Sequence, residues 1–561
     1  MSDYDVCIIG SGAGGGAAAW RLTMAGFRVL VLEKGPWFTE ADYFKDELAC
    51  CRRSVYTPDL RDERHVVEEP DGEGDWNATP TSEADYDFWN GNVVGGSSNF
   101  MSGFFHRLKP VDFRLRSEFG PITGANVVDW PIGYDDLEPY YTEVERAVGV
   151  SGKVVPHRFL EPRSTPDFPY PPTAEHPVSA WIDTACEQLG FHSLPLPRAV
   201  LSQPKGKRRS CEYAGYCGSY GCATGAKGSS RAALLDEAVA TGRCEVRPHS
   251  HVLRLSSDAR GRVNGAIYRD QAGKKHTVDA SIYVVACQSV ETSRLLLSSR
   301  GPRHPHGLGN RYGQVGRNLI FSGGGISHGR FVYAELDAAR TAQVQAVGPF
   351  VNRTLHDWYV IDDPTLGRVK GGVMDFLFHH PNVVSRATAL ARDDAGKLVW
   401  GSALKRRMET TLRGERRIDC EVFVDWLPTD NCFVRLDSEV RDKWGQPVAS
   451  VRIGAHPHDL KVGGYLAEKG RQVLAAIGAR DTVASVSAAP PTNLMGGGCR
   501  FGNDPRSSVL DADCRMHGVD NLFVADGSFM PTGGSVTYTW TIYANALRVG
   551  DKIAAQLGRP G

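Results

Sequence analysis

Glycines near the amino terminus have the spacing of a dinucleotide-binding turn. An apolar run, "DVCIIG", leads into a G-x-G-x-x-G pattern, and the turn comprises Gly10, Gly12, Ala13, Gly14 and Gly15. Such glycines turn the chain, let backbone N–H groups approach a pyrophosphate and allow a helix to pack closely on a strand. The next apolar run ends at Glu33 and Lys34, where an acid can accept hydrogen bonds from a ribose 2′-hydroxyl. Because the glycine turn, the helix, the second strand and the acid follow one another as in a dinucleotide-binding unit, we interpret this segment as such a unit.

Three clustered cysteines could bind a metal centre. Cys211, Cys217 and Cys222 have the spacing C-x5-C-x4-C in "SCEYAGYCGSYGCATGAKG", a glycine-containing segment that can wrap around a small object. Structural zinc usually takes four protein ligands, and no clear fourth ligand lies nearby in the sequence. Three interpretations remain open: a cysteine-ligated cluster, cysteines that are reduced or locally disulfide-bonded, and zinc.

Composition and charge exclude several other classes of protein. The chain has 561 residues, 41% of them hydrophobic, and 64 basic against 65 acidic residues. This balance creates no overall field toward nucleic acid or anionic lipid. No apolar stretch reaches the roughly 18 residues that a membrane span needs, and the first strand begins too early to follow an export signal. We therefore expect a cytoplasmic protein of two or three domains. The basic stretch 204–209, "PKGKRR", is either a solvated loop or a docking site for an acidic partner.

The elements that position these groups are interlaced along the chain. The carboxy-terminal part returns to nucleotide-fold character, with a buried strand in "NLFVADG" and an amphipathic helix that carries Ile542, Ala546 and Val549 near one face. Between residues 330 and 480, stretches such as "RIDCEVFVDWLP" predict an antiparallel sheet in a second lobe. Because the first and last strands of the nucleotide fold lie near opposite ends of the chain, inserts must interrupt that fold.

Several segments resemble those of the glucose–methanol–choline (GMC) flavoprotein oxidoreductases, in the same order along nearly the whole chain. They are the opening strand–helix–strand unit, "GNVVGGSSNFMSG", "DWPIGYDDLEPYY", "VVACQSVETSRLLLSS", "GQVGRNLIFSGG" and "DPRSSVLDADCRMHGVDNLFVADGSFMPTGG". Within the family, the chain is most similar to the flavoprotein subunits of bacterial gluconate, fructose and glucose dehydrogenases. The resemblance implies an α/β fold in which a Rossmann-like FAD-binding domain is interlaced with an antiparallel-sheet substrate domain.

On this basis we predict domain boundaries. The FAD-binding domain would comprise residues 1–40, 90–130, 200–330 and 490–561. Residues 41–89 would form a lid or excursion, 131–199 a connector with a helical segment, and 331–489 the substrate-binding domain.

The resemblance also implies roles for individual residues around FAD. The glycine turn would hold the pyrophosphate, and Glu33 the adenosine ribose. A second loop would run beside the flavin ring, with small residues that let backbone amides meet its polar edge; it contains Gly95, Gly96, Ser97 and Asn99. Further contacts would come from Val252 to adenine, from Asp526 and Gly527 near the ribityl and diphosphate, and from Thr537 near the pyrimidine end of the flavin.

For the cysteines, the resemblance implies a [3Fe–4S] iron–sulfur cluster, because several dehydrogenases of this branch carry one in the corresponding region. Such a cluster would pass electrons singly to a protein acceptor such as a cytochrome. The same branch implies a small companion subunit whose export signal could carry the folded chain to the periplasm, an alternative to the cytoplasmic location.

The family's catalytic histidine is missing from this sequence. The stretch "NLMGGGCRFG" places Asn493 at the first position of the usual pair, and "GGSVTYTWTI" places Thr537 at the second. Asn and Thr side chains can orient a substrate hydroxyl, but neither has a pKa suited to taking its proton near neutral pH.

Three explanations for this departure remain open. A different residue could be the base, and the candidates are Tyr538, His106, His379 and His380. Alternatively, a neighbouring carbonyl or amine could activate the substrate C–H, or the chemistry could have drifted to a non-redox lyase reaction. Cys499 could also reach the pocket, although a small buried thiol is the commoner role.

The sequence as a whole predicts an FAD-dependent dehydrogenase that oxidises a CH–OH group of a sugar, sugar acid or related alcohol. A flavin oxidase, a lyase and an electron-transfer or scaffold subunit without chemistry of its own are the alternatives. Only a dehydrogenase or oxidase of alcohols would lose its yellow colour when mixed anaerobically with them.

Overall fold

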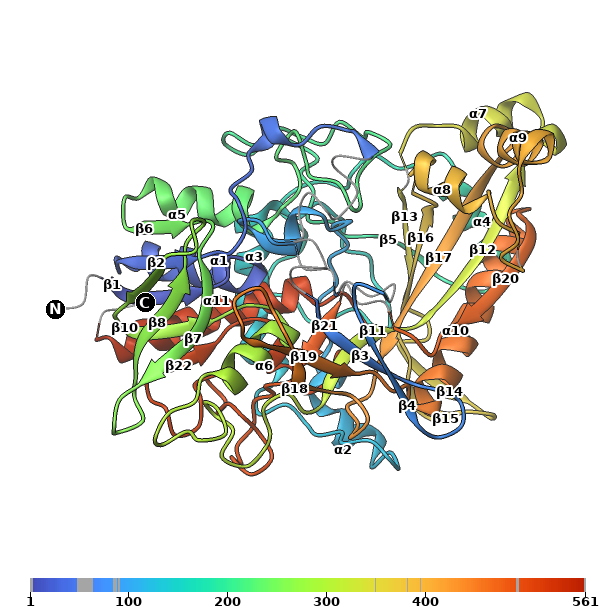
Figure 1. Cartoon of the computed structure of the whole chain (residues 1–561). Helices are drawn as coiled ribbons and strands as arrows, with labels where there is room; N and C mark the ends of the chain where they lie inside the picture. Colours follow the sequence, from blue (N-terminus) through green and yellow to red (C-terminus); the bar gives the residue numbers. More distant parts are fainter. Residues whose placement is uncertain are drawn as a thin grey trace.

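The computed structural model describes residues 4–47, 64–83, 88, 91–348, 350–380, 382–393, 395–490 and 494–558. Figure 1 shows two lobes side by side, a nucleotide lobe around β1, β2 and β10 and a second lobe around β12, β16 and β17. Within the described part of the chain, no helix is both long enough and apolar enough to span a membrane.

A parallel five-stranded sheet forms the centre of the nucleotide lobe. Its strands lie in the order β22 (Leu522–Val524), β10 (Ala280–Val285), β1 (Tyr4–Ile9), β2 (Val29–Leu32) and β6 (Cys244–Arg247). Short apolar runs buried on both faces are typical of parallel strands. Strands from both ends of the chain share this sheet, so the nucleotide lobe is interlaced as predicted.

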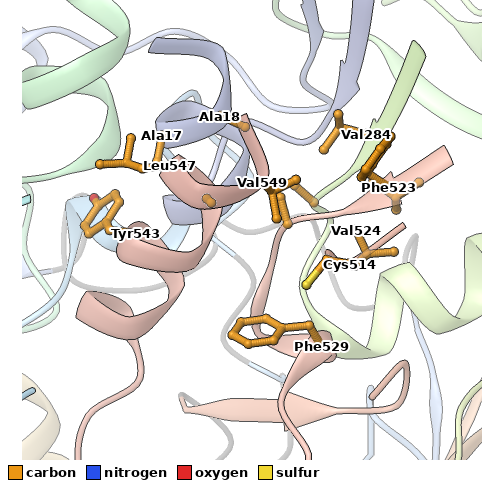
Figure 2. Packing of buried hydrophobic residues seen from close by; sticks show 14 of the residues in the cluster. Ala17, Ala18, Val284, Cys514, Phe523, Val524, Phe529, Tyr543, Leu547 and Val549 are labelled. Atoms are coloured by element: carbon orange, nitrogen blue, oxygen red, sulfur yellow. The ribbon is translucent and has the colours of Figure 1, made fainter. Parts of the chain in front are cut away.

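Two helices from opposite ends of the chain pack together on this sheet. They are α1 (Ala13–Met24) and α11 (Thr539–Gln556). The small residues Ala17 and Ala18 let α11 approach α1 closely, so that Leu547 and Val549 are buried (Figure 2). Burying a leucine or valine side chain contributes about 1.5–3 kcal/mol. The same cluster in Figure 2 includes Val284, Cys514, Phe523, Val524, Phe529 and Tyr543.

The second lobe is built on an antiparallel sheet. Its strands lie in the order β20 (Arg480–Val486), β12 (Gly325–Val332), β17 (Glu415–Asp425), β16 (Val373–Phe378), β13 (Phe350–Leu355) and β5 (Ser193–Pro195). Apolar residues on alternate positions pack with α4 (Ser179–Leu189) and α10 (Pro457–Ala476), which lie on one face of the sheet. The short strand β11 (Leu319–Gly323) pairs with both β17 and β21 (Met495–Gly497).

Two smaller sheets flank the nucleotide lobe. One contains β7 (His251–Ser257), β8 (Val263–Arg269) and β9 (Lys275–Val278), and the other has the order β18 (Phe433–Arg441), β19 (Pro447–Arg452), β3 (Val66–Pro70) and β4 (Trp76–Pro80). The described part of the predicted lid, 64–83, is thus a hairpin that pairs with β19. The pairing of β3 with β19 joins the 41–89 segment to residues near 450. The predicted domain boundaries stay a prediction.

The remaining elements are short. Helix α2 (Leu115–Phe119) precedes the predicted connector and α3 (Tyr134–Val144) lies within it, α5 (Asp236–Ala240) precedes β6, and α6 (Ser289–Ser298) follows β10. In the second lobe, β14 (Val360–Asp363) pairs with β15 (Gly367–Lys370), and α7 (Ala338–Val344), α8 (Val383–Ala389) and α9 (Gly401–Glu409) connect strands.

Candidate active site

A cavity of about 870 Å³ lies between the two lobes. At the nucleotide end it is lined by the glycine turn from Gly10 to Gly14, by Glu33 and by Lys34. At the other end its walls come from the second lobe and include Gly324, Glu421 and Phe423. A molecule bound at the glycine turn can therefore extend to the sheet of the second lobe without leaving the cavity.

The glycine turn has the close contacts that its residue types predict. A Cβ atom on Gly15 would lie 1.9 Å from the carbonyl oxygen of Gly10, and one on Gly14 would lie 2.0 Å from that of Ala525. By contrast, a Cβ atom on Gly12 would have no neighbour within 4 Å. Gly12 is the N-cap of α1, and no side chain among the described residues caps that end. Unpaired N–H groups at the start of α1 therefore face the cavity, as an anion site requires.

Glu33 is fixed by the neighbouring backbone. Its carboxylate accepts hydrogen bonds from the Ser11 N–H at 3.0 Å, the Ser11 hydroxyl at 2.6 Å and the Gly35 N–H at 3.0 Å. Burial raises the pKa of Glu33, although these hydrogen bonds oppose the increase. The Ser11 hydroxyl also accepts a hydrogen bond from the Gly95 N–H at 3.0 Å. Ser11, which the sequence analysis did not select, therefore joins the turn, the acid and the second glycine loop.

The second glycine loop lies directly against the first. Gly95 and Gly96 both have positive φ angles, +95° and +57°, and a Cβ atom on Gly96 would lie 2.8 Å from the Cα atom of Gly12. Ser97 accepts a hydrogen bond from a backbone N–H at 3.0 Å, and the Asn99 amide donates to two carbonyls of its own loop at 3.0 Å each. The structure thus brings together the two loops that the sequence analysis assigned to one cofactor.

Asp526, Gly527 and Val252 also line the cavity. The Asp526 carboxylate accepts hydrogen bonds from the Gln288 N–H and the Ser528 N–H, each at 2.9 Å, so its position is fixed. Burial raises the pKa of Asp526, against the effect of its hydrogen bonds with Ser528 and Thr292. Val252 lies on β7. All three positions can contact a dinucleotide, and their specific roles stay predictions.

The two residues predicted to replace the histidine pair have different outcomes. Asn493 lies outside the described residues. The Thr537 hydroxyl lies at the cavity wall but donates its proton to the carbonyl oxygen of Phe104 at 3.0 Å. Thr537 can therefore accept a hydrogen bond from a ligand, while its own proton is already used.

Tyr538 lines the cavity, but its hydroxyl is turned toward Gly533. That hydroxyl is buried beside Gly533 and has no hydrogen-bond partner among the described residues. Burial raises the pKa of Tyr538 well above its usual value, and the nearby Asp425 and Asp459 carboxylates raise it further. This environment does not suit the base that the sequence analysis considered.

The candidate histidines are separated in the structure. His106 is buried with its Nε2 atom 3.0 Å from Asp375, and His379 is partly exposed with its Nδ1 atom 3.0 Å from Asp419. Only His380 of these three lines the cavity described above. Burial, assisted by His379, lowers its pKa to about 4. Cys499 is buried and burial raises its pKa to about 12, which fits an inert core thiol.

Glu421 is a cavity residue that the sequence analysis missed. It lies on β17 directly opposite Asp375 of β16. Burial, together with the neighbouring carboxylates of Asp375 and Asp419, raises the pKa of Glu421 to about 8. The alternation in "RIDCEVFVD" could have suggested an inward acid, but not which acids face one another.

The three clustered cysteines lie beside the cavity. All three are free thiols, and the neighbouring Gly218 and Ser219 line the cavity wall. Among the described residues, the sulfur atoms of Cys211, Cys217 and Cys222 do not form a group within 4.8 Å of one another. Thiolates around a single tetrahedral zinc ion lie about 3.8 Å apart, from Zn–S bonds of about 2.3 Å. The arrangement therefore does not resemble a preformed zinc site.

Lys227 connects the cysteine segment to the second glycine loop. Its buried ammonium donates hydrogen bonds to the carbonyl oxygens of Asn99 and Cys217 at 3.2 Å and of Tyr220 at 2.8 Å. Burial lowers the pKa of Lys227. Burial also acts to raise the pKa of Cys222, but the Lys227 charge and hydrogen bonds outweigh it and lower that pKa. The sequence offered no signal for this buried lysine.

The fold and cavity define an oxidoreductase class in which a dinucleotide cofactor faces a second, antiparallel lobe. Residues 169–321 and 428–546 match profiles described as GMC oxidoreductase, and residues 8–38 match an NAD(P)-binding Rossmann-like domain. Over 99% of its length, the chain is 32% identical to 6'''-hydroxyparomomycin C oxidase of Streptomyces lividus, covering 92% of that protein. It is 31% identical to 2-methyl-1,2-propanediol dehydrogenase of Mycolicibacterium austroafricanum, over 98% of this chain and 95% of the relative. It is also 28% identical to the fructose dehydrogenase large subunit of Gluconobacter japonicus, over 99% of this chain and 98% of the relative.

Solved structures share the fold at lower identity. Formate oxidase of Aspergillus oryzae RIB40 aligns with a TM-score of 0.62 at 17% identity, covering 99% of this chain and 98% of that chain. Pyridoxine 4-oxidase from Mesorbium loti aligns with a TM-score of 0.59 at 16% identity, covering 98% of this chain and 99% of that chain. The chain belongs to the GMC oxidoreductase family, and it is an FAD-binding enzyme that acts on CH–OH donors. The predicted family and fold class are confirmed.

Proposed function

We propose that this enzyme oxidises a CH–OH group of a sugar, sugar acid or related polyol within the cavity between the lobes. The observation that carries the proposal is the continuity of that cavity, whose lining extends from Gly12 to Glu421 and Phe423. The names of the relatives, which include a fructose dehydrogenase subunit and a propanediol dehydrogenase, support hydroxylated substrates. The oxidase names among them make molecular oxygen the alternative electron acceptor.

The residues at the nucleotide end fit FAD. The uncapped start of α1 would bind the pyrophosphate, because its N–H groups and helix dipole attract anions. Glu33 would meet the ribose, and the backbone of the loop at Gly95 and Gly96 would lie along the flavin ring. When bound there, FAD supplies a hydride acceptor at its N5 atom. The second lobe would exclude bulk water and hold the substrate carbon against that acceptor.

Anaerobic mixing with a panel of alcohols tests this function. We expect the yellow absorbance to bleach with one or more hydroxylated compounds such as hexoses, sugar acids or vicinal diols. Oxygen admitted afterwards distinguishes the acceptors, because rapid return of colour with hydrogen peroxide indicates an oxidase and slow return a dehydrogenase. A flavin that no alcohol bleaches would contradict the proposal.

We further propose that Cys211, Cys217 and Cys222 hold a [3Fe–4S] cluster that would supply one-electron transfer to a cytochrome. Their thiols are free and do not all lie within 4.8 Å of one another, which suits a site that binds several irons rather than one ion. Proximity of Gly218 and Ser219 to the cavity supports a short path from the flavin. Relatives named as the large subunit of a dehydrogenase and as a dehydrogenase flavoprotein support a companion subunit.

Iron analysis of anaerobically purified protein tests the cluster. We expect about three irons per chain and visible absorbance beyond the flavin bands, both lost in Cys217→Ser, while the FAD content stays unchanged. Cys186→Ser is the matched control, because Cys186 is a buried thiol of the second-lobe core. Wild-type protein that has full FAD but no iron would contradict the cluster proposal alone.

A further inference from the structure

The wall opposite the glycine turn contains few groups that can accept a proton from an alcohol. The Thr537 hydroxyl is hydrogen-bonded to Phe104, and the Tyr538 hydroxyl points away from the cavity. His380 lines the wall, but its surroundings disfavour the protonated imidazole that a base must become. Glu421 is the acidic side chain that β17 contributes to this wall.

The position of Glu421 follows from the pleat of β17. Alternate residues Ile418, Cys420 and Val422 pack in the core with α10, so Glu421 and Phe423 face the opposite side. Phe423 lines the same cavity. An acid on this face of β17 therefore has no role in the core of the second lobe.

The charged neighbours of Glu421 are mostly acidic. Asp375 lies directly across on β16, and Asp419 lies two residues away on β17. On the other side, the register partner on β12 is Ile326, followed on β20 by Ser485; the titratable group of β12 on this face is His328, which lies opposite Asp419. Like charges directly opposite on antiparallel strands are destabilising.

The positive groups of this region are engaged with the other two acids. His106 lies 3.0 Å from one oxygen of Asp375, whose second oxygen is buried without a hydrogen-bond partner among the described residues. Asp419 is paired with His379 at 3.0 Å and with Arg417 at 2.6 Å. The adjacent His380 also lines this wall of the cavity. Burial, with a further contribution from Asp375 and Asp419, raises the pKa of Glu421 to about 8, near the range in which general bases work efficiently.

We propose that Glu421 is the general base that accepts the hydroxyl proton of the substrate, in place of the missing histidine. The inference rests on the proposed function. As the O–H bond breaks, its proton forms a bond to the Glu421 carboxylate and the electron pair of that O–H bond forms the C=O bond. FAD, when bound, would supply the acceptor for the carbinol hydrogen, which would leave with the C–H electron pair as a hydride, so that the alcohol would be oxidised by two electrons. Asp375, held by His106, acts as a positioning residue through its charge.

Stopped-flow reduction of the FAD-loaded enzyme tests this role. With an alcohol that bleaches the wild type, we expect Glu421→Gln to slow flavin reduction by about 10²–10⁴-fold, the usual contribution of a general base. In the wild type, kcat/KM should rise with pH through about 8, because the carboxylate must be ionised; Glu421→Gln should lack this rise. Glu421→Asp, which retains a carboxylate, should recover part of the rate and the pH dependence.

Two variants serve as controls. Glu415→Gln makes the same change on β17, at a carboxylate that is paired with Arg330 away from the cavity, and should leave the rate unchanged. His380→Asn tests the competing base. If His380→Asn abolishes the rise of kcat/KM with pH while Glu421→Gln retains it, the assignment of Glu421 as the base is wrong.

A second readout does not depend on activity. Because the folded-state pKa of Glu421 lies above the ordinary value of 4.5, the folded protein binds more protons than the unfolded protein between about pH 4.5 and 8. The free energy of unfolding should therefore fall as pH rises through this window, and Glu421→Gln should lack that contribution and be the more stable protein at pH 9. An infrared band of a protonated carboxyl should likewise disappear near pH 8 in the wild type and be missing in the variant.

The outcomes separate the two proposals. If no alcohol bleaches the wild type, the proposed function fails. If the wild type is bleached and Glu421→Gln reduces its flavin within tenfold of the wild-type rate, only the assignment of Glu421 fails. Absence of both the infrared band and the stability difference would also overturn it.

Discussion

Gly15→Ala should abolish FAD binding and prevent most of the protein from folding. Its new Cβ atom would lie 1.9 Å from the Gly10 carbonyl oxygen and 3.3 Å from the Ala286 side chain. Because these neighbours are the backbone directly after β1 and a residue that follows β10, the methyl group can fit only if α1 moves off the sheet. Soluble yield, thermal unfolding and absorbance of bound flavin measure the effect.

Gly12→Ala is the matched control within the same turn. No atom lies within 4 Å of the Cβ position, and its φ of −61° suits alanine. We expect this variant to fold with nearly unchanged thermal stability but to bind FAD at least tenfold more weakly, because its methyl group projects where the pyrophosphate would lie. If Gly12→Ala binds FAD as tightly as the wild type, the pyrophosphate does not lie beside Gly12. A stable, flavin-loaded Gly15→Ala protein would contradict the packing of α1 on the sheet.

Lys227→Met should destabilise both the cysteine segment and the loop beside the flavin. The substitution removes three hydrogen bonds that a buried ammonium donates to carbonyl oxygens, of which the Cys217 oxygen also accepts a hydrogen bond from the Tyr220 N–H at 3.0 Å. Hydrogen bonds to a charged group contribute about 1.5–3 kcal/mol each, so we expect a loss of at least 3 kcal/mol in the free energy of unfolding. Urea unfolding followed by far-ultraviolet circular dichroism measures this change.

The same substitution should change the chemistry of Cys222. Without the ammonium that favours its thiolate, the pKa of Cys222 rises, so its alkylation by iodoacetamide near neutral pH should slow in the iron-free protein. Lys207→Met is the control, because Lys207 is an exposed lysine in the same part of the chain. Unchanged stability and unchanged thiol reactivity in Lys227→Met would refute this account of the buried lysine.

The parts of the site that could be predicted from sequence are those whose residues are adjacent in the chain. The glycine turn and Glu33 belong to one strand–helix–strand unit, so spacing alone indicates their arrangement. The loop at Gly95 was recognised by its resemblance to the family. Its contact with Gly12 arises from tertiary packing that no local pattern specifies.

The substrate side depended on strand register and was therefore not predicted. Glu421 and Asp375 are far apart in sequence and meet only because β16 and β17 pair in one particular register. A shift of one residue would turn Glu421 into the core. Similarly, the sequence predicted a polar excursion for residues 64–83, because the strand that pairs with them, β19, lies far along the chain near residue 450.

The most direct test of the account is the visible spectrum of the purified protein together with its FAD content. If the cavity between the lobes holds a flavin on the uncapped end of α1, the protein is yellow, contains one FAD per chain and recovers that colour when the stripped protein is mixed with FAD. A folded but colourless protein that fails to bind added FAD would contradict the account.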